Sequence, residues 1–129
     1  MAVRPIADGL FELDADGGIA LVGGFSASSG RYHFPLLASC PYTGATDVER
    51  VTLSTDATLW AWTAVNTAAP GYEGPVPYGF GVVELPEDGL RVVTRLSESD
   101  PAALRQGMAM RFTTVAVTDA TTTWCFEPA

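Results

Sequence analysis

The residues whose spacing suggests metal chemistry lie in the segment FSASSGRYHFPLLASCPYTG, residues 25–44. Ser26 and Ser29 are separated by two residues and precede a glycine, and Cys40 and Thr43 form a second pair with the same separation. Structural zinc sites space their four ligands in this way, but they use thiolates or imidazoles as ligands. Only Cys40 is such a ligand, because the neutral hydroxyls of serine and threonine bind zinc poorly.

A metal-free knuckle is therefore the expectation for this segment. His33 lies nearby in the sequence, but together with Cys40 it gives only two competent ligands where a structural site needs four. Serine and threonine side chains can instead bond to backbone groups in turns. We expect no metal and no cofactor, with Ser26, Ser29, Cys40 and Thr43 as degenerate ligand positions.

No other group of residues has the composition of a catalytic site. The segment GFSAS lacks the Gly-x-Ser-x-Gly turn that presents a nucleophile, so His33, the single histidine, is expected to be structural. Cys125 lies between Trp124 and Phe126 in a predicted strand and is expected to pack as a small apolar residue. The segment GFGVVE carries no lysine and precedes no helix, which excludes a phosphate-binding loop. We expect no catalytic residues in this chain.

The composition excludes several classes of partner. The net charge of −8 opposes general nucleic-acid binding, since a phosphate backbone repels an acidic surface. All seven basic residues are arginines, which reflects either genomic composition or a local anion site built from planar guanidinium groups. Two cysteines make no disulfide framework. No signal peptide is recognisable, and no run approaches the roughly 20 apolar residues of a membrane helix, so we expect a cytoplasmic protein without membrane contact.

The elements that must position these residues follow from the hydrophobic pattern. Residues 48–54 and 58–66 alternate and are interpreted as one long first strand bent near residues 54–58. A PEDG turn joins the next two strands into a hairpin, a helix of about two turns follows, and two strands complete the chain. This order predicts a five-stranded OB-fold barrel; an SH3-like barrel and a small sandwich fit the same pattern. The predicted ranges after the first strand are 78–85, 90–96, 97–107 for the helix, 108–118 and 121–128.

The segment before the barrel divides into two parts. Residues 1–18 are expected to be an N-terminal extension, with GLFEL as a short helix or strand and DADGG as a turn. Residues 19–47 are expected to form the knuckle, in which two short strands flank the first ligand pair. The barrel is assigned to residues 48–129.

Several motifs of the barrel resemble a known family. TLWAWTAVN, PGYEGPVPYGFGVVEL and GLRVVTRL, followed by LRQGMAMR, are similar to segments of the zinc-ribbon/OB-fold proteins associated with acyl-CoA metabolism, the domain of unknown function thirty-five family. The resemblance runs from about residue 19 to the C-terminus. The ribbon pattern of that family is Cys-x-x-Cys-Gly, then Phe-Pro, then Cys-Pro-x-Cys, and this chain retains Gly30, Phe34, Pro35, Cys40 and Pro41. The resemblance implies a rubredoxin-like zinc ribbon that has lost three of its four ligands.

The resemblance also implies a function. Members of that family resemble non-catalytic partners of thiolase-superfamily proteins, among them thiolases, acyltransferases and the aldolases that shorten CoA-activated steroid side chains. An accessory subunit is thus expected, in a heterotetramer with a thiolase-like or aldolase subunit, where it helps to form the channel for acyl-CoA. Both formation and cleavage of a carbon–carbon bond remain open. The alternative is a stand-alone OB-fold module that binds acyl-CoA or another small ligand.

The contact residues expected for this role lie in the long loop of residues 67–77 and in the two strands after it. A loop of this length without regular structure favours a functional role over a simple crossing of one barrel end. Arg91 and Arg95 fall on one strand face. They contact acidic groups of a partner or a CoA phosphate, or the face is simply exposed to solvent. The expected channel or partner contacts are Tyr72, Pro75, Pro77, Tyr78, Phe80, Arg91 and Arg95; the expected ribbon contacts are Tyr32, Phe34 and Tyr42. Trp60, Trp62 and Trp124 are expected in the core.

Overall fold

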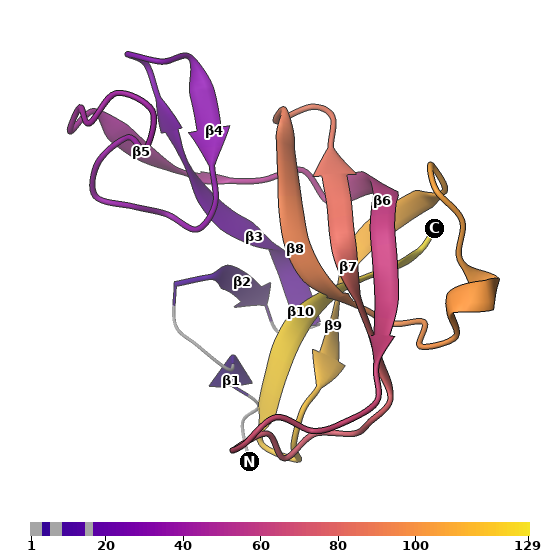
Figure 1. The fold of residues 1–129 in the computed structure, drawn as a ribbon. Helices are drawn as coiled ribbons and strands as arrows, with labels where there is room; N and C mark the ends of the chain where they lie inside the picture. The colour runs from indigo at the N-terminus through magenta and orange to yellow at the C-terminus, as the bar shows by residue number, and fades with distance from the viewer. Residues whose placement is uncertain (1–3, 6–8, 15–16) are drawn as a thin grey trace.

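The computed structural model describes residues 4–5, 9–14 and 17–129, and its strands form a barrel with a second sheet beside it (Figure 1). Neighbouring barrel strands run in the order β10, β8, β7, β6 and β9, and β9 pairs back with β10, so the barrel is closed. Among the pairings of these five strands, only that of β8 with β10 is parallel. This topology confirms the predicted OB fold. The barrel strands are β6 (Asp56–Val65), β7 (Tyr78–Leu85), β8 (Leu90–Leu96), β9 (Ala109–Ala116) and β10 (Thr121–Pro128).

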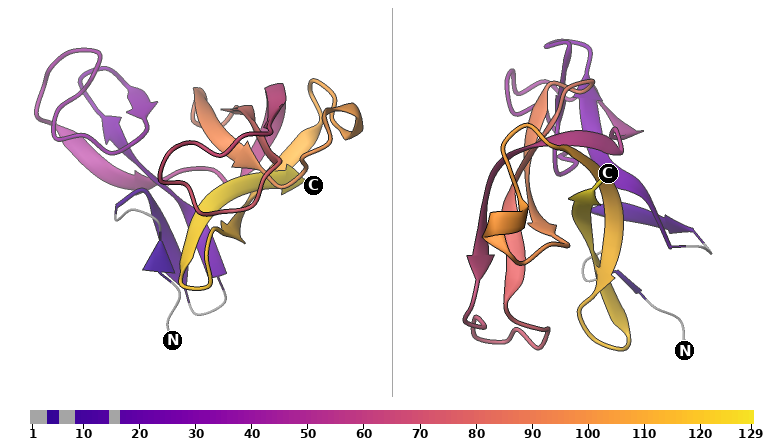
Figure 2. Two further views of the ribbon diagram at one scale, coloured as in Figure 1. Left: turned by 60° about the horizontal axis from the view of Figure 1, so that its bottom comes forward. Right: turned by 90° about the vertical axis from the view of Figure 1, so that its right-hand side faces the viewer.

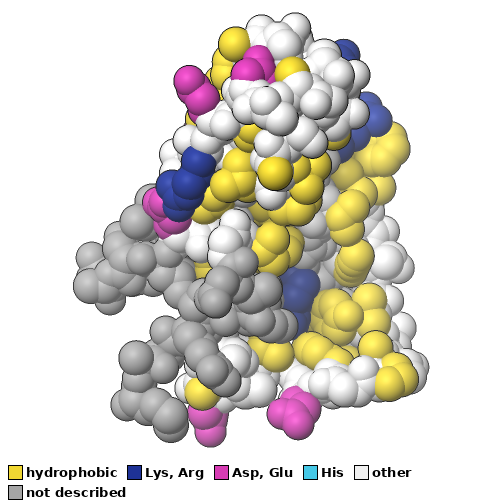
Figure 3. Space-filling view, turned by 90° about the vertical axis from the view of Figure 1, so that its left-hand side faces the viewer, with side chains coloured by type: hydrophobic (Ala, Val, Ile, Leu, Met, Phe, Trp, Pro, Cys, Tyr) yellow, Lys and Arg dark blue, Asp and Glu magenta, His cyan; other side chains and the backbone are white. Residues whose placement is uncertain are grey.

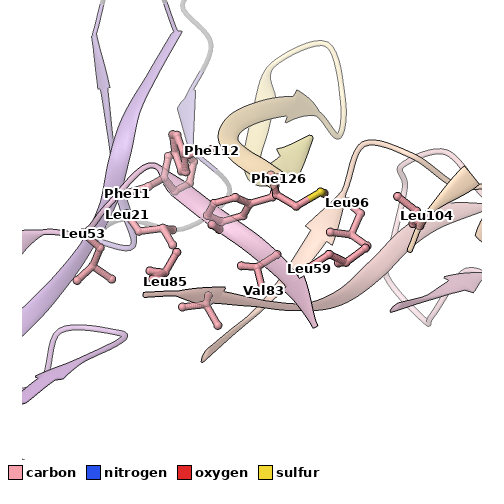
Figure 4. Packing of buried hydrophobic residues seen from close by; sticks show 13 residues of the cluster. Phe11, Leu21, Leu53, Leu59, Val83, Leu85, Leu96, Leu104, Phe112 and Phe126 are labelled. Carbon is pink, nitrogen blue, oxygen red and sulfur yellow. The ribbon is translucent and has the colours of Figure 1, made fainter. Parts of the chain in front are cut away.

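The barrel interior is filled by alternate residues of its strands. In β7, Gly79, Gly81, Val83 and Leu85 are buried, and the residues between them are only half-buried. This period of two sends one set of side chains to the core and the other to the outer face. Figure 4 shows Phe126 from β10 among the buried side chains of the neighbouring strands.

The glycines of β7 permit a close approach between strands. A Cβ atom at Gly81 would collide with the carbonyl oxygen of Ala61, and one at Gly79 would collide with that of Glu98. Both obstacles are backbone atoms, which cannot move aside as a flexible side chain would. These glycines therefore let β6 and the segment after β8 pack closely against β7, just after the long loop.

A second sheet, which we call the knuckle sheet, lies beside the barrel (Figure 2). The long strand β3 pairs antiparallel with β2, β4 and β5 in turn. Phe11, Leu21 and Leu53 of this part pack into the same buried cluster as the barrel residues, so the two sheets share one core. The strands are β2 (Phe11–Asp14), β3 (Gly17–Ser26), β4 (Arg31–His33) and β5 (Val48–Thr52), while β1 (Arg4–Pro5) adds to β10.

The predicted bent first strand is wrong. Residues 48–52 form β5, which pairs with β3 in the knuckle sheet, and the barrel begins only at Asp56. Alternation along the chain signals a strand but does not say which sheet it joins, and the intervening turn sends the two strands in different directions. The last three residues of the segment GLFEL lie in the strand β2; Ala15 and Asp16 of the predicted DADGG turn lie outside the described residues. The domain limits at residues 18 and 47 remain a prediction.

The predicted two-turn helix is shorter than expected. Only Pro101–Ala103 form a single 3-10 turn, η1, with Asp100 accepting a hydrogen bond from the Ala102 N–H at 3.0 Å. The chain leaves the helix because the Gly107 N–H bonds to the Leu59 carbonyl at 2.7 Å. The segment is thus held against β6. Asp100 caps this turn, and Pro101 begins it.

The tryptophans do not all enter the core. Trp60 sits at a register shift between Leu59 and Ala61, and 39% of it is exposed. A β-bulge adds one residue to a strand and re-aims the side chain there, which is why the expectation of a buried Trp60 is wrong. Trp62 and Trp124 are half-buried and pack against the core. Among the described residues, none belongs to a helix long and apolar enough to cross a membrane.

Candidate functional site

The loop between β6 and β7, residues 66–77, is organised around Tyr72. Its ring lies 5.3 Å from that of Tyr78, measured between centroids. Its hydroxyl donates a hydrogen bond to the carbonyl oxygen of Pro75 at 2.9 Å, and Gly74 lies against the ring so closely that a Cβ there would collide. A loop rich in proline and glycine is thus folded onto an aromatic pair at one end of the barrel.

Arg95 of β8 connects this aromatic pair to the barrel. Its guanidinium lies 4.3 Å from the ring centroid of Tyr78 and 5.8 Å from that of Tyr72. Its Nη1 donates to the Tyr72 hydroxyl at 3.1 Å. Its Nε is buried and has no hydrogen-bond partner among the described residues. The cation is therefore fixed by aromatic groups, with one donor left unsatisfied.

A shallow cavity of about 270 Å³ adjoins Arg95 on the outer face of the barrel. Val93, which is 58% exposed, lies at this cavity. The complete lining is Phe80, Val93, Thr94, Arg95, Thr123 and Trp124. Figure 3 shows hydrophobic side chains gathered on the part of the surface beside the knuckle sheet, with a basic side chain between them. We call the outer surface of β7 and β8 together with this cavity the β7–β8 face.

Arg91 occupies the other end of the same face. Its guanidinium lies 4.2 Å from the ring centroid of Trp60, and its Nε donates to a carboxylate oxygen of Glu84 at 3.4 Å. The prediction that Arg91 and Arg95 share one strand face is confirmed, since both point outward from β8. Their surroundings differ, however, because Arg91 has an acidic partner within this chain.

Of the other predicted contact residues, one lines the cavity and two are exposed on the loop. Phe80 lines the cavity next to Arg95. Pro75 and Pro77 are exposed, and Pro75 contributes its carbonyl group to Tyr72. Trp60 of β6 borders this face through its contact with Arg91, and the sequence interpretation missed it because no signal in the alternating pattern reveals the bulge that exposes it.

The four degenerate ligand positions meet in the knuckle. The Cys40 sulfur lies 3.5 Å from the Ser29 hydroxyl, and the Ser26 hydroxyl donates to a carboxylate oxygen of Asp47 at 2.7 Å. Burial raises the pKa of the Cys40 thiol, but hydrogen bonding with Ser26, Thr43 and Ser29 outweighs burial and lowers the pKa to about 6. The site is thus a polar cluster around a buried thiol whose pKa is lowered by its hydroxyl neighbours.

The polar cluster does not have the ligands of a metal site. No group of three or more His, Cys, Asp and Glu side chains within residues 4–5, 9–14 and 17–129 could hold a metal ion. Asp47 instead satisfies hydroxyl and backbone donors of the first knuckle, including the Ser28 N–H at 2.7 Å. Those hydrogen bonds lower the pKa of Asp47, with that of Ser26 contributing most. Hydrogen bonds therefore tie the two halves of the knuckle together.

The three predicted ribbon contacts differ in what they touch and in how exposed they are. Phe34 meets Trp124 edge-on at 5.8 Å between ring centroids, which joins the knuckle to the barrel. Tyr32 packs against Phe25 with tilted rings, 4.9 Å between centroids. Tyr42 remains 47% exposed and lines a groove of about 520 Å³ between the knuckle and the turn from β7 to β8. Tyr42 is thus the residue of the three that is available for contact.

His33 and Cys125 have structural surroundings, as expected. His33 is buried, its Nε2 accepts from the Leu37 N–H at 3.3 Å, and Gly24 lies directly against its ring. Burial raises the pKa of the Cys125 thiol to about 12, so this residue stays neutral and packs as an apolar side chain.

The chain is similar to a family model, to a curated sequence and to solved structures. A family model described as "ChsH2, C-terminal OB-fold domain" matches residues 50–115. A DUF35 domain-containing scaffold protein of Pyrococcus furiosus is 30% identical over 94 residues, which cover 73% of this chain and 68% of that protein.

Two solved structures share the fold. The Ltp2-ChsH2(DUF35) aldolase superposes with a TM-score of 0.68 at 24% identity, over 84% of each chain. A protein of unknown function from the DUF35 family of Sulfolobus solfataricus superposes with a TM-score of 0.53 at 12% identity, over 84% of this chain and 75% of that one.

Proposed function

Because the chain belongs to the domain of unknown function thirty-five (DUF35) family, we propose that it is a non-catalytic accessory subunit that forms a heteromer with a thiolase-superfamily protein. The observation that carries this proposal is the similarity to a DUF35 scaffold protein over 73% of this chain. The match to the OB-fold domain of ChsH2 points to an aldolase as the kind of partner. The catalytic residues would then belong to that partner.

The β7–β8 face supplies the surface that such a partner needs. Val93 is among the exposed large hydrophobic residues, and Phe80 and two tyrosines lie close by. Tyrosine, phenylalanine and arginine are the residue types enriched at the centres of protein interfaces. The chain is strongly acidic as a whole, yet this face presents Arg91 and Arg95. We therefore assign the partner to this face.

The loop beside this face would form part of a channel for acyl-CoA in the complex. Tyr72, Tyr78 and Phe80 offer a wall of aromatic rings, and Pro75 and Pro77 limit the backbone freedom of the loop. A rigid apolar wall suits the acyl chain or pantetheine arm of a substrate such as a CoA-activated steroid side chain. The knuckle would make subunit contacts through Tyr42 without a metal ion.

Co-expression tests the accessory role. The chain would be expressed with each thiolase-superfamily polypeptide of the same genome, with an affinity tag on one component only. We expect one polypeptide to co-purify in a fixed ratio through a second column that does not bind the tag. A monomeric chain with no stabilised partner contradicts the proposal.

Calorimetry with CoA esters separates this role from that of a stand-alone binding module. The isolated chain is expected to bind an acyl-CoA weakly, because the partner would supply most of the channel. A dissociation constant of about 1 μM or below for the chain alone would favour the stand-alone module instead.

A further inference from the structure

The outer face of β7 and β8 is apolar where an exposed sheet face is usually polar. The outward residues of β7 begin with Tyr78, Phe80 and Val82, and each is only half-buried. On β8, Val93 is the register partner of Val82 and is 58% exposed, although its chain neighbours are buried. An antiparallel sheet with one face in water normally alternates apolar and polar residues. Here both faces carry apolar side chains, so the outer face has the composition of a covered surface.

One cavity on this face has an apolar lining. It measures about 270 Å³, and Phe80, Val93 and Trp124 line it together with Arg95 and two threonines. Nearly all of its accessible lining is apolar. Two polar atoms of the lining residues, Nε of Arg95 and Nε1 of Trp124, are buried and out of reach of a ligand. A charged or strongly polar group in the cavity would lose its hydration without gaining hydrogen bonds from these atoms.

We propose that this cavity receives one large apolar side chain of the partner subunit, a leucine, a methionine or a phenylalanine. The side chains that contribute most to an interface fill well-packed pockets near its centre. Cavities that bind small molecules usually measure about 300–1,000 Å³, and this one is smaller and open to the surface. It therefore suits an anchoring side chain better than a whole metabolite. The proposal rests on the proposed function, because it names the contact through which the partner binds.

The charges around the cavity disfavour a second copy of this chain as the occupant. Arg91 and Arg95 lie two residues before and two residues after Val93 on β8, on the same strand face. A symmetric dimer brings the same patch of both copies together, so the arginines of one copy would lie near those of the other. Like charges placed together across an interface weaken binding. A different subunit, with acidic residues around its apolar anchor, would complement the two arginines instead.

The walls of the cavity are held in place before binding. Trp124 meets the ring of Phe34 edge-on, with 5.8 Å between the centroids. The guanidinium of Arg95 lies 4.3 Å from the ring centroid of Tyr78. Side chains that are already fixed lose little rotamer freedom when a partner binds. The cavity is therefore formed in the free chain and does not depend on the anchor for its shape.

A benzene titration tests the cavity without any partner. Benzene has the ring of phenylalanine without a charge or a hydrogen-bond donor, and apolar cavities in proteins bind it. In carbon–proton spectra, benzene is expected to shift the signals of Val93, Phe80 and Trp124, and acetate at the same concentration serves as the charged probe. The methyl signals of Leu37, which is 44% exposed on the knuckle, serve as an internal control. Shifts no larger than those of Leu37, or larger shifts with acetate, overturn the apolar site.

Truncation of Val93 tests the anchor in the complex. Val93→Ala removes part of the cavity wall and is expected to weaken the complex about 5-fold or more, whereas Leu37→Ala, a larger truncation, should change the affinity less than about 2-fold. Both positions are exposed, so both variants should melt at the temperature of the wild type. A folded Val93→Ala variant that binds like the wild type, or an equal loss for Leu37→Ala, overturns the anchor.

Photochemical crosslinking identifies the occupant. Phe80→p-benzoylphenylalanine extends a ring that already lines the cavity. After irradiation of the complex, mass spectrometry is expected to find the crosslink at a leucine, methionine or phenylalanine of the partner subunit. A crosslink to a second copy of this chain, or only to charged residues of the partner subunit, overturns the assignment of the occupant.

The outcomes separate this proposal from the proposed function. A complex that forms and is unaffected by Val93→Ala overturns the anchor and leaves the accessory role intact. A chain that binds benzene in the cavity but binds no thiolase-superfamily protein contradicts the accessory role and the assignment of the occupant, while the apolar site itself stands.

Discussion

The guanidinium of Arg95 lies over the ring of Tyr78, 4.3 Å from its centroid. Arg95 is the register partner of Phe80 on the paired strands β8 and β7, and Tyr78 lies two residues before Phe80 on the same face, at the end where the long loop enters the barrel. The loop tyrosine Tyr72 completes the cluster through its hydroxyl. A basic residue of a strand and an aromatic loop thus form one unit on the surface proposed for the partner.

Removal of the Tyr72 hydroxyl should loosen this unit. Tyr72→Phe deletes the acceptor of Arg95 and the donor to Pro75 and is expected to lower the free energy of unfolding by about 1 kcal/mol. Arg91→Gln breaks a pair whose side chains are largely exposed and should cost about 0.5 kcal/mol or less. Urea denaturation measures both. A larger loss for Arg91→Gln than for Tyr72→Phe contradicts the assigned roles.

A charge at Val93 should block the partner without unfolding the chain. Val93 is 58% exposed, so Val93→Asp is expected to change the free energy of unfolding by about 0.5 kcal/mol or less. The new carboxylate lies beside Arg95 and competes for its guanidinium, so binding of the partner should fall at least about 10-fold. Val93→Thr, which keeps the shape without the charge, serves as the control in a binding titration. Unchanged affinity for Val93→Asp would place the partner elsewhere.

The stability of the chain should rise as the pH increases from about 6 to about 9. Hydrogen bonding with Ser26, Thr43 and Ser29 outweighs burial and lowers the pKa of Cys40 to about 6 in the folded state, against 9.0 for a free thiol. Between these values the folded chain carries a thiolate and the unfolded chain a thiol, so a higher pH favours folding, and this contribution is lost as the pH falls through about 6.

Cys40→Ser isolates this effect. The difference in free energy of unfolding between wild type and Cys40→Ser, measured in urea at several pH values, should grow from pH 6 to pH 9. Cys125→Ser serves as a comparison, because burial raises the pKa of Cys125 to about 12, and its contribution changes only above pH 9. A difference for Cys40→Ser that is constant across this range would show that its pKa is not lowered.

Restoring the ligands should restore a metal site in the knuckle. The Cys40 sulfur and the Ser29 hydroxyl are 3.5 Å apart, close to the roughly 3.8 Å between two thiolates of a tetrahedral zinc site with 2.3 Å bonds. The triple variant Ser26→Cys, Ser29→Cys, Thr43→Cys is expected to bind one zinc ion and to melt at a higher temperature with zinc than with a chelator.

Elemental analysis provides the comparison with the wild-type chain. Wild type is expected to contain no stoichiometric zinc, and the double variant Ser26→Cys, Ser29→Cys, with one ligand fewer, should bind zinc more weakly than the triple variant. Zinc in the wild-type chain at one ion per molecule contradicts the metal-free knuckle.

The sequence predicts the barrel because most of its strands alternate clearly and its capped turn falls between the third and fourth strands. It does not predict the partner of β5, since strand pairing with β3 depends on contacts distant in the sequence. The exposure of Trp60 depends on a bulge that leaves no mark in the alternating pattern. The contact between Arg95 and Tyr72 depends on the fold of the loop, although both residues were candidates from their types alone.

The mass of the complex in solution tests the accessory role most directly. This 13.6 kDa chain would be mixed with its co-purified thiolase-superfamily subunit and separated by size-exclusion chromatography with light scattering. We expect a single peak with the mass of two copies of each subunit. The mixture with the Val93→Asp chain should elute as two separate peaks. Separate peaks for the wild-type mixture at micromolar concentration would contradict the account.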